Sequence, residues 1–213
     1  MPVSKPVKEY YEARAPEYDE WYLDVGQYAA RNRPGWHEAV RALERAVASL
    51  PPASTLDVAC GTGFLTRHLA GRVTGLDQSE AMLAIASERV PDGRFVQGDG
   101  TALPFEDGAF DRVFTGHFYG HLEPGVREAF LAEARRVASE LVVVDSAWAG
   151  PSRAWGSRAR EEWQERVLND GSRFHVYKRY FDAAELAAEL GGGSVLLSSD
   201  WFVMVSAGQE LRP

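Results

Sequence analysis

A predicted strand runs into a glycine turn at Asp57-Val58-Ala59-Cys60-Gly61-Thr62-Gly63-Phe64, and this stretch decides the fold. The apolar run Thr55–Cys60 has the length of a buried strand, and Gly63–Ala70 has the apolar spacing of a helix. Glycines at this junction let the backbone approach a ligand closely and leave the first N–H groups of the helix facing it. Such turns also occur as plain tight connections, so the surrounding sequence decides between a binding site and a simple turn.

Strand-length apolar runs and helical stretches alternate from this turn up to Asp145. The strands predicted after the turn are Arg72–Asp77, Arg94–Gln97, Asp111–Thr115 and Leu141–Asp145. The helices predicted between them are Ser79–Arg89 and Val126–Val137. Because strands that alternate with helices pair in parallel through right-handed crossovers, this order predicts a parallel sheet with helices on both faces.

Elements on both sides of this block complete the sheet. An amphipathic helix before it ends at Pro51-Pro52, and a helix capped by Asp182 follows it and ends at Leu190. Val195–Ser199 and Phe202–Ala207 are separated by so few residues that only an antiparallel hairpin can connect them. We therefore predict an α/β fold, a Rossmann-like doubly wound sheet of about seven strands that is mostly parallel, with an antiparallel hairpin strand at the C-terminal end.

Length and composition restrict the functional classes. The 213 residues suit one domain over 1–213, and 45% hydrophobic with 25% charged residues is typical of a globular protein. The formal charge of −8 disfavours nucleic acid as a partner, because the phosphate backbone attracts basic surfaces. No apolar run has the length of a membrane helix and one cysteine forms no internal disulfide, so we expect no membrane partner and a cytoplasmic location. The oligomeric state stays open.

Two aromatic-rich segments lie outside the alternation of strands and helices. Residues 1–36 are too aromatic for a disordered tail, and we expect them to form a lid. Residues 147–180 stand between the fifth predicted strand and the last helix, and we expect them to contribute to a substrate pocket. Trp148, Trp155 or Trp163 could form apolar walls there, although each could equally be a core anchor.

Acidic residues at successive strand ends favour a nucleoside pocket over a simple turn. Asp77 follows Asp57 by 20 residues, the spacing at which a carboxylate accepts hydrogen bonds from both ribose hydroxyls. Asp99 follows the third strand between two glycines, which bring the backbone close to a flat ring. The alternative, that Asp77 and Asp99 only cap turns, requires the three features to coincide by chance.

Four ordered motifs carry a resemblance to a known family. They are Leu56-Asp57-Val58-Ala59-Cys60-Gly61-Thr62-Gly63, then Gly75-Leu76-Asp77-Gln78-Ser79 with Met82-Leu83, then Gly98-Asp99-Gly100-Thr101-Ala102-Leu103-Pro104-Phe105, and Phe110-Asp111. With them the chain resembles class I S-adenosylmethionine-dependent methyltransferases, specifically the small-molecule branch similar to ubiquinone and menaquinone biosynthesis methyltransferases. That family usually has glycine where this chain has Ala59, and for one added methyl we expect a small backbone shift at most.

The resemblance implies S-adenosylmethionine as cofactor, S-adenosylhomocysteine as product and a small-molecule methyl acceptor. It implies that Asp57 lies at the methionine part of the cofactor, Asp77 at the ribose and Asp99 at the adenine amino group. The implied cofactor-binding residues are Asp57, Ala59, Cys60, Gly61, Gly63, Asp77, Gln78, Asp99, Gly100, Thr101, Thr115, Gly116, Tyr10, Tyr18 and Tyr22. The tyrosines come from the lid, where phenol groups could bind the cofactor carboxylate or face the sulfonium, and plain core packing is the alternative for each.

Methyl transfer from a sulfonium to oxygen, nitrogen or carbon is an in-line displacement that requires alignment and exclusion of water. A general base is needed only where the acceptor carries a proton. His117, just beyond the fourth strand, is the candidate catalytic base, and packing without proton transfer is its alternative.

Further aromatic and histidine residues are candidates for substrate binding. They are Tyr11, Tyr119, His121, Trp148, His175 and Tyr177. His175 and Tyr177 share a face if Arg173–Phe181 is extended. Arg173 and Arg179 could meet an acidic group of the substrate, although each could be a solvated charge.

Three rival functions compete with methyl transfer. We expect no metal site, because His117 and His121 have no obvious third ligand. An NAD(P)-dependent oxidoreductase would have glycine or alanine at the third fingerprint position, where this chain has Thr66. A non-catalytic protein of the same fold, which binds the cofactor or acts as an interaction partner, is the alternative that sequence leaves open.

Overall fold

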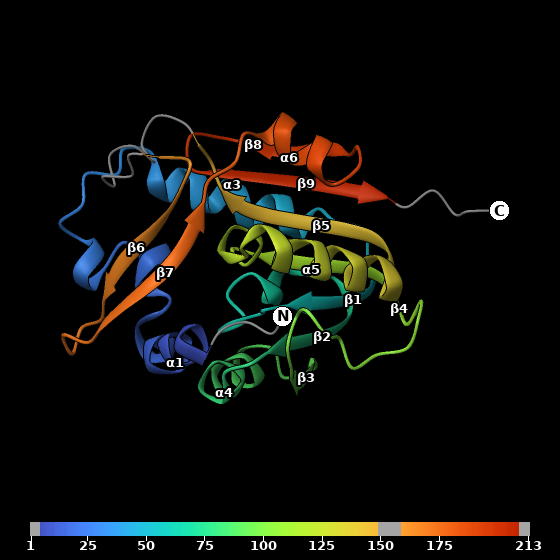
Figure 1. Ribbon diagram of the computed structural model, residues 1–213, viewed down its shortest axis with the longest axis horizontal. Helices are drawn as coiled ribbons and strands as arrows, with labels where there is room; N and C mark the ends of the chain where they lie inside the picture. The colour runs from blue at the N-terminus through green and yellow to red at the C-terminus, as the bar shows by residue number, and fades with distance from the viewer. Residues whose placement is uncertain (1–4, 149–158, 209–213) are drawn as a thin grey trace.

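A seven-stranded sheet forms the centre of the computed structural model, which describes residues 5–148 and 159–208 (Figure 1). Its strands are β1 (Ala53–Val58), β2 (Gly71–Asp77), β3 (Arg94–Gln97), β4 (Phe110–Gly116), β5 (Ala138–Ser146), β8 (Ser194–Ser198) and β9 (Phe202–Gly208). The strand order is β3-β2-β1-β4-β5-β9-β8, and β9 runs antiparallel to both of its neighbours while the other pairs are parallel. The predicted mostly parallel sheet with its C-terminal hairpin is confirmed.

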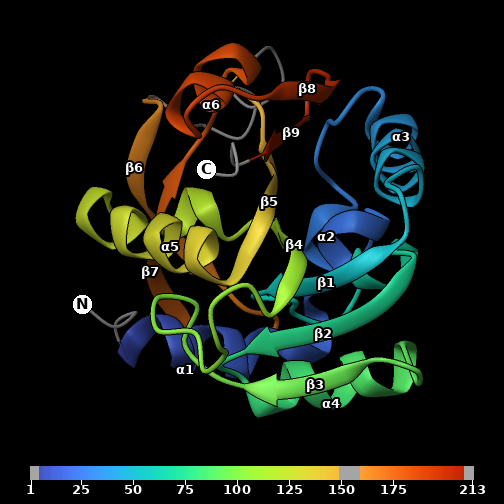
Figure 2. The ribbon, with the colours of Figure 1, turned by 90° about the vertical axis from the view of Figure 1, so that its right-hand side faces the viewer.

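Helices cover both faces of this sheet (Figure 2). On one side α3 (Trp36–Ala48) packs its buried face over the strands, and on the other lie α5 (Pro124–Val137) and α6 (Ala183–Glu189). Strand alternation separates the two layers, since Val142 and Val144 of β5 join the α3 layer and Val143 joins the α5 layer. No helix in the described ranges is long and apolar enough to cross a bilayer.

Side-chain caps fix the starts of two predicted helices. The Ser79 hydroxyl accepts the Met82 N–H at 3.1 Å where α4 (Glu80–Arg89) begins. Asp182 likewise accepts the N–H groups of Ala184 and Glu185 at the start of α6. Glu185, however, does not complete a capping box, because its carboxylate pairs with Arg160 instead.

The helix predicted over Gly63–Ala70 is wrong. Only a 3-10 turn forms there, at Thr66–His68, and Leu69 is already extended before β2 begins. Gly61 and Gly63 both have positive φ, 55° and 74°, which is not helical backbone. The turn therefore takes up the first residues of the short connection between β1 and β2. The remainder is too short to nucleate a stable helix, and no regular helix N-terminus faces the turn.

A two-stranded hairpin that the sequence did not predict stands beside the N-terminal helix (Figure 1). It consists of β6 (Glu161–Val167) and β7 (Arg173–Arg179), which pair antiparallel outside the main sheet. Asn169-Asp170-Gly171 provides the turn, and Gly171 takes a φ of 87°. This turn sequence was the signal that could have revealed the hairpin.

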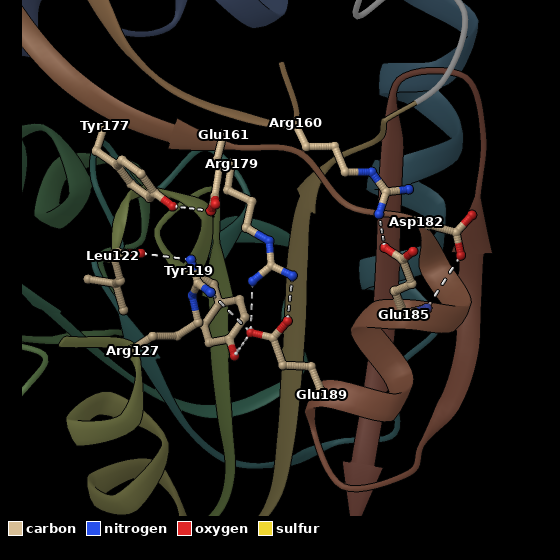
Figure 3. A network of polar contacts seen from close by, with 10 residues as sticks. All are labelled: Tyr119, Leu122, Arg127, Arg160, Glu161, Tyr177, Arg179, Asp182, Glu185 and Glu189. Atoms are coloured by element: carbon tan, nitrogen blue, oxygen red, sulfur yellow. Dashed lines mark hydrogen bonds and ion pairs between the residues drawn. The ribbon is translucent and has the colours of Figure 1, made fainter. Parts of the chain in front are cut away.

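Partly buried ion pairs fix the base of the hairpin to the helices (Figure 3). Glu189 of α6 accepts hydrogen bonds from the Tyr119 hydroxyl at 2.8 Å and from Arg179 at 3.2 Å. Arg127 of α5 lies 3.3 Å from the same Glu189 oxygen and donates to the Leu122 carbonyl. Because one carboxylate is shared by three elements, the hairpin is held in a fixed position over the sheet.

The N-terminal segment is folded and packs against the glycine turn. It contains α1 (Lys5–Arg14) and α2 (Glu20–Leu23), joined and followed by 3-10 turns at Ala15–Glu17 and Gly26–Tyr28. Asp19 accepts the Thr62 hydroxyl at 2.6 Å and pairs with Arg89 of α4 at 2.5 Å. These contacts hold the segment over the carboxyl ends of β1 and β2.

Candidate active site

Three adjoining hollows lie where the parallel strands end, below the N-terminal segment. The large chamber, of about 650 Å³, is lined by Gly61, Asp77, Gly98, Gly100 and their neighbours. The narrow chamber, of about 260 Å³, is lined by Tyr22, Asp57, Cys60, Phe64 and their neighbours. The basic chamber, of about 420 Å³, is lined by Tyr11, Arg14, Tyr18, Trp21, His117, His121, Ser146, Arg166 and Lys178. Tyr18 lines all three chambers, so they meet at its ring.

Asp77 is held rigidly at the wall of the large chamber. One carboxylate oxygen accepts the Gly61 N–H at 2.9 Å and the other accepts the Ser79 N–H at 3.0 Å. Burial raises the pKa of this carboxyl, and the two N–H groups oppose the rise. Both oxygens keep further lone pairs, so Asp77 can accept from a bound ligand as well.

Glycine at position 100 forms part of the wall of the large chamber, where its backbone packs tightly against Val58 and Phe118. A Cβ there would lie 2.8 Å from Val58, closer than real side chains approach, and 3.0 Å from the Phe118 ring. Gln78 also lines this chamber. Close packing therefore requires glycine at position 100, and the chamber wall there is backbone.

Asp57 supplies an unsatisfied acceptor to the narrow chamber. Its Oδ2 accepts the Thr66 hydroxyl at 2.6 Å, but the buried Oδ1 has no hydrogen-bond partner among the described residues. Burial raises the pKa of Asp57 to about 7. A buried carboxylate oxygen of this kind requires a donor, and a cationic amino group would satisfy it best. Cys60 beside it is no nucleophile, because burial raises the pKa of its thiol well above the ordinary value.

Two non-glycine residues at the site adopt left-handed backbone. Ala59 and His117 both have φ of 58°. The predicted small shift at Ala59 is therefore an incomplete description, because the backbone keeps the left-handed conformation and the methyl group is strained in it by about 1–2 kcal/mol. Strain at two positions that line the chambers is typical of ligand-binding sites.

His117 lines both the large and the basic chambers. Its Nε2 is buried without a partner among the described residues, and its Nδ1 lies 3.9 Å from Asp145, too far for a hydrogen bond. Burial lowers the pKa of the imidazole, so the ring is neutral at pH 7. Trp21 packs edge-on against the ring at 4.8 Å. The ring is therefore a buried, neutral imidazole, and no hydrogen bond within the described ranges fixes which nitrogen carries the proton.

His121 lines the same junction with a defined tautomer. Its Nδ1 lies 2.7 Å from the Tyr177 carbonyl oxygen, which can only accept, so Nδ1 carries the proton. Burial lowers the pKa of His121 well below its ordinary value. Tyr11 meets this ring edge-on at 6.1 Å.

Sequence analysis missed the cations of the basic chamber. Arg14 comes from α1, Arg166 from β6 and Lys178 from β7. Lys178 lies 2.5 Å from the fully buried Asp145, a residue that sequence analysis saw only as a strand end. The signal for Lys178 was the period of two in β7, which places Lys178 on the same face as Val176.

That same register corrects the substrate-binding predictions on β7. His175 and Tyr177 do share a face, but it is the face opposite Val176 and Lys178. His175 is exposed, and the Tyr177 hydroxyl donates to Glu161 at 2.6 Å. Neither side chain lines a chamber.

Several other predicted residues also lie away from the chambers. The Tyr119 hydroxyl is committed to Glu189, and Trp148 packs beside Tyr180 with a centroid distance of 6.1 Å. Tyr10 lies in a small core with Leu168. These positions are explained by packing, because each ring is covered by its neighbours.

Among the remaining apolar-wall and arginine candidates, Trp163, Arg173 and Arg179 line no chamber, and Trp155 is not tested. Trp163 is 55% exposed, and Trp155 lies outside the described residues. Arg173 pairs with Glu165 at 2.6 Å on the exposed face of the hairpin. Arg179 is engaged by Glu189, so neither arginine is free for a substrate group.

Three residues that were predicted to bind the cofactor line none of the three chambers and contact neighbouring residues instead. Asp99 accepts the Thr101 N–H and hydroxyl, each at 2.8 Å, while Gly98 and Gly100 on either side line the large chamber. The Thr115 hydroxyl donates to the Val58 carbonyl at 2.8 Å. Gly63 approaches Ala86 of α4 so closely that a Cβ would lie 3.3 Å away.

Comparison with known proteins identifies the family. A family model described as a methyltransferase domain matches residues 55–140. The demethylmenaquinone methyltransferase of Renibacterium salmoninarum is 38% identical over 139 residues, which are 62% of this chain and 54% of that protein. The enzyme of the same name from Thermotoga maritima is 41% identical over 91 residues, which are 40% of this chain and 39% of that protein. The chain spans about half the length, or less, of these curated relatives.

A solved structure extends the likeness over the whole fold. The DhpI-SAM-HEP complex is 30% identical to this chain with a TM-score of 0.75, and the match covers 96% of this chain and 98% of that one. The chain belongs to the class I S-adenosylmethionine-dependent methyltransferase family.

Proposed function

We propose that this protein transfers a methyl group from S-adenosylmethionine to an oxygen, nitrogen or carbon atom of a small molecule. The observation that carries the proposal is the unpaired Oδ1 of Asp57 in the narrow chamber. It supplies the acceptor that the amino group of the cofactor needs, next to a chamber of about 650 Å³ with a second fixed carboxylate, Asp77.

The residues at the site fit the cofactor from end to end. Asp57 would hold its amino group and Asp77 its ribose hydroxyls, while Gly100 and Gln78, which line the large chamber, would meet the adenine. The phenols of Tyr18 and Tyr22, both lining the narrow chamber, are the candidates for its carboxylate. When bound, the cofactor supplies a methyl group activated on a sulfonium.

The chain contributes positioning, exclusion of water and a proton acceptor. The N-terminal segment closes the chambers from above, so a reacting pair would be aligned in a site of low dielectric constant. His117 presents a neutral, unpaired Nε2 at the junction of two chambers, where it can accept a proton from an acceptor hydroxyl or amine. The geometry supports His117 as the general base for protonated acceptors.

The form of the site supports a small acceptor. The basic chamber is a recess lined by residues of the N-terminal segment, the hairpin and the strand ends, which is the kind of site that small molecules occupy. The acidic composition that disfavours nucleic acid, and the cytoplasmic location, remain predictions from the sequence. The names of the curated relatives indicate a quinone-type substrate for those proteins.

Titration with S-adenosylhomocysteine, followed by a transfer assay, tests the proposal. We expect saturable binding by calorimetry that Asp57→Ala weakens at least tenfold, and that Asp92→Ala, which removes an exposed carboxylate, leaves unchanged. A metabolite extract incubated with methyl-labelled cofactor should then yield a labelled small molecule. Absence of binding by the wild-type protein would refute the proposal, and binding without any labelled product would favour the non-catalytic alternative.

A further inference from the structure

The basic chamber is lined by three cationic side chains and by no carboxylate. Arg14 enters it from the N-terminal segment, and Arg166 and Lys178 enter from the hairpin. The chain as a whole carries a formal charge of −8, so the chamber has the opposite sign to the protein around it. Concentrated positive charge in a recess attracts anions and is costly to keep without them.

Neither arginine of the chamber has an ion-pair partner within the part of the chain that the structure describes. Arg14 donates to the Tyr10 and Tyr28 hydroxyls, which are neutral. Arg166 donates to the Gln164 amide oxygen at 2.6 Å, and its buried Nε has no partner. Two guanidinium charges are therefore uncompensated at the chamber wall.

The third cation is already neutralised. Lys178, with 4% of its side chain exposed, lies 2.5 Å from Asp145. Asp145 also accepts the N–H groups of Gly120 and Ser146, each at 2.7 Å, which fixes it in place. Glu162 stands opposite Lys178 in the hairpin register but accepts from Gln164 at 2.7 Å and does not line the chamber. The net charge of the chamber is thus two positive charges.

We propose that the basic chamber binds an oxyanion of the methyl acceptor, a carboxylate or a phosphate, and that the protein therefore methylates small anionic molecules. The inference rests on the proposed function. Guanidinium forks donate two parallel hydrogen bonds to such groups, and this matches the unpaired donors of Arg14 and Arg166.

The placement of the chamber directs the rest of the acceptor toward the reacting position. The basic and large chambers share Tyr11, Tyr18, His117 and His121 as a common wall. A molecule anchored on Arg166 can therefore reach the common wall to which His117 belongs. The carboxylate of the cofactor itself is a poorer occupant, because the basic chamber contains no residue of the glycine turn and none of the three cations lines the narrow chamber.

The test is a titration of protein saturated with S-adenosylhomocysteine, using inorganic phosphate in one arm and acetate in the other, by calorimetry at constant ionic strength. We expect at least one anion to bind, and Arg166→Gln to weaken that binding about tenfold or more through loss of a charge-assisted pair. Arg166→Lys, which keeps the charge but loses the fork, should recover part of the affinity. Arg173→Gln is the matched control, since it removes an exposed arginine from the other face of the same hairpin.

The outcomes separate this inference from the proposed function. If phosphate binds more tightly than acetate, the chamber is assigned to a tetrahedral oxyanion, and if acetate binds more tightly, it is assigned to a carboxylate. Either result supports the proposal. If S-adenosylhomocysteine binds but neither anion does, or if Arg166→Gln binds them as Arg173→Gln does, the proposal is overturned while the proposed function stands. If S-adenosylhomocysteine itself fails to bind the wild-type protein, the proposed function and this inference fall together.

Discussion

Binding of S-adenosylhomocysteine should release a proton from Asp57. Burial holds the pKa of this carboxyl at about 7 in the free protein, where its Oδ1 has no hydrogen-bond partner in the described part of the chain. An ammonium group placed on that oxygen favours the charged form and lowers the pKa, so the carboxyl is ionised in the complex. The ligand therefore binds the ionised form of Asp57, whereas in slightly acidic solution the free protein mainly carries the protonated form.

The number of protons released follows from the populations of the two charge states of Asp57. With a pKa of about 7, roughly nine-tenths of the free protein carries the proton at pH 6 and roughly one-tenth at pH 8. Binding should release about 0.9 proton at pH 6 and about 0.1 at pH 8, and affinity should rise about tenfold between these values. Burial lowers the pKa of His117 below its ordinary value, so this imidazole is mainly neutral at pH 7 and above.

Calorimetry in buffers that differ in ionisation enthalpy measures the released proton directly. Asp57→Asn should remove the release, and any remainder would belong to Asp77, whose pKa burial also raises. An affinity that stays flat from pH 6 to pH 8, with heats independent of buffer in the wild-type protein, would refute the reasoning that Oδ1 receives a cationic group.

Three further substitutions test separate parts of the site. Asp77→Ala should weaken S-adenosylhomocysteine binding by about 2–4 kcal/mol, since it loses acceptors for two hydroxyls; an affinity equal to that of Asp92→Ala would place the ribose elsewhere. His117→Asn, which tolerates the positive φ but lacks the imidazole, should cut turnover on a protonated acceptor by about 100-fold with cofactor affinity nearly intact; a normal rate would leave alignment as the whole mechanism. Ala59→Gly should raise the free energy of unfolding by about 0.5–1 kcal/mol in denaturant titrations by relieving left-handed strain, whereas Ala84→Gly on the exposed face of α4 should lower it by a similar amount.

The core of the fold was predictable because its signals are local. Each parallel strand is a short apolar run, and caps such as Ser79 and Asp182 mark helix starts in the sequence itself. Asp57 and Asp77 were identified for the same reason, since both stand at strand ends, Asp57 just before the glycine turn and Asp77 20 residues after Asp57. The helix predicted after the glycine turn failed because periodicity does not show how few residues are left before the next strand begins.

The acceptor half of the site was less predictable because it is assembled from distant segments. Arg14 is far in sequence from Arg166 and Lys178, which the pairing of the hairpin strands brings together, and only the docking of the hairpin against α1 adds Arg14. In β7 the alternation was visible, but which face is covered depends on that docking. His175 was therefore placed on the wrong face, and Lys178 was overlooked.

The hairpin's separation from the main sheet has an evolutionary consequence. Its two strands hydrogen-bond to each other and add no strand to the sheet that carries Asp57 and Asp77. A substitution on the inner face of the hairpin would therefore change which methyl acceptors bind, while the residues that hold the nucleoside stay in place. Related proteins with this architecture can thus acquire new acceptor specificities through a few substitutions in the hairpin alone.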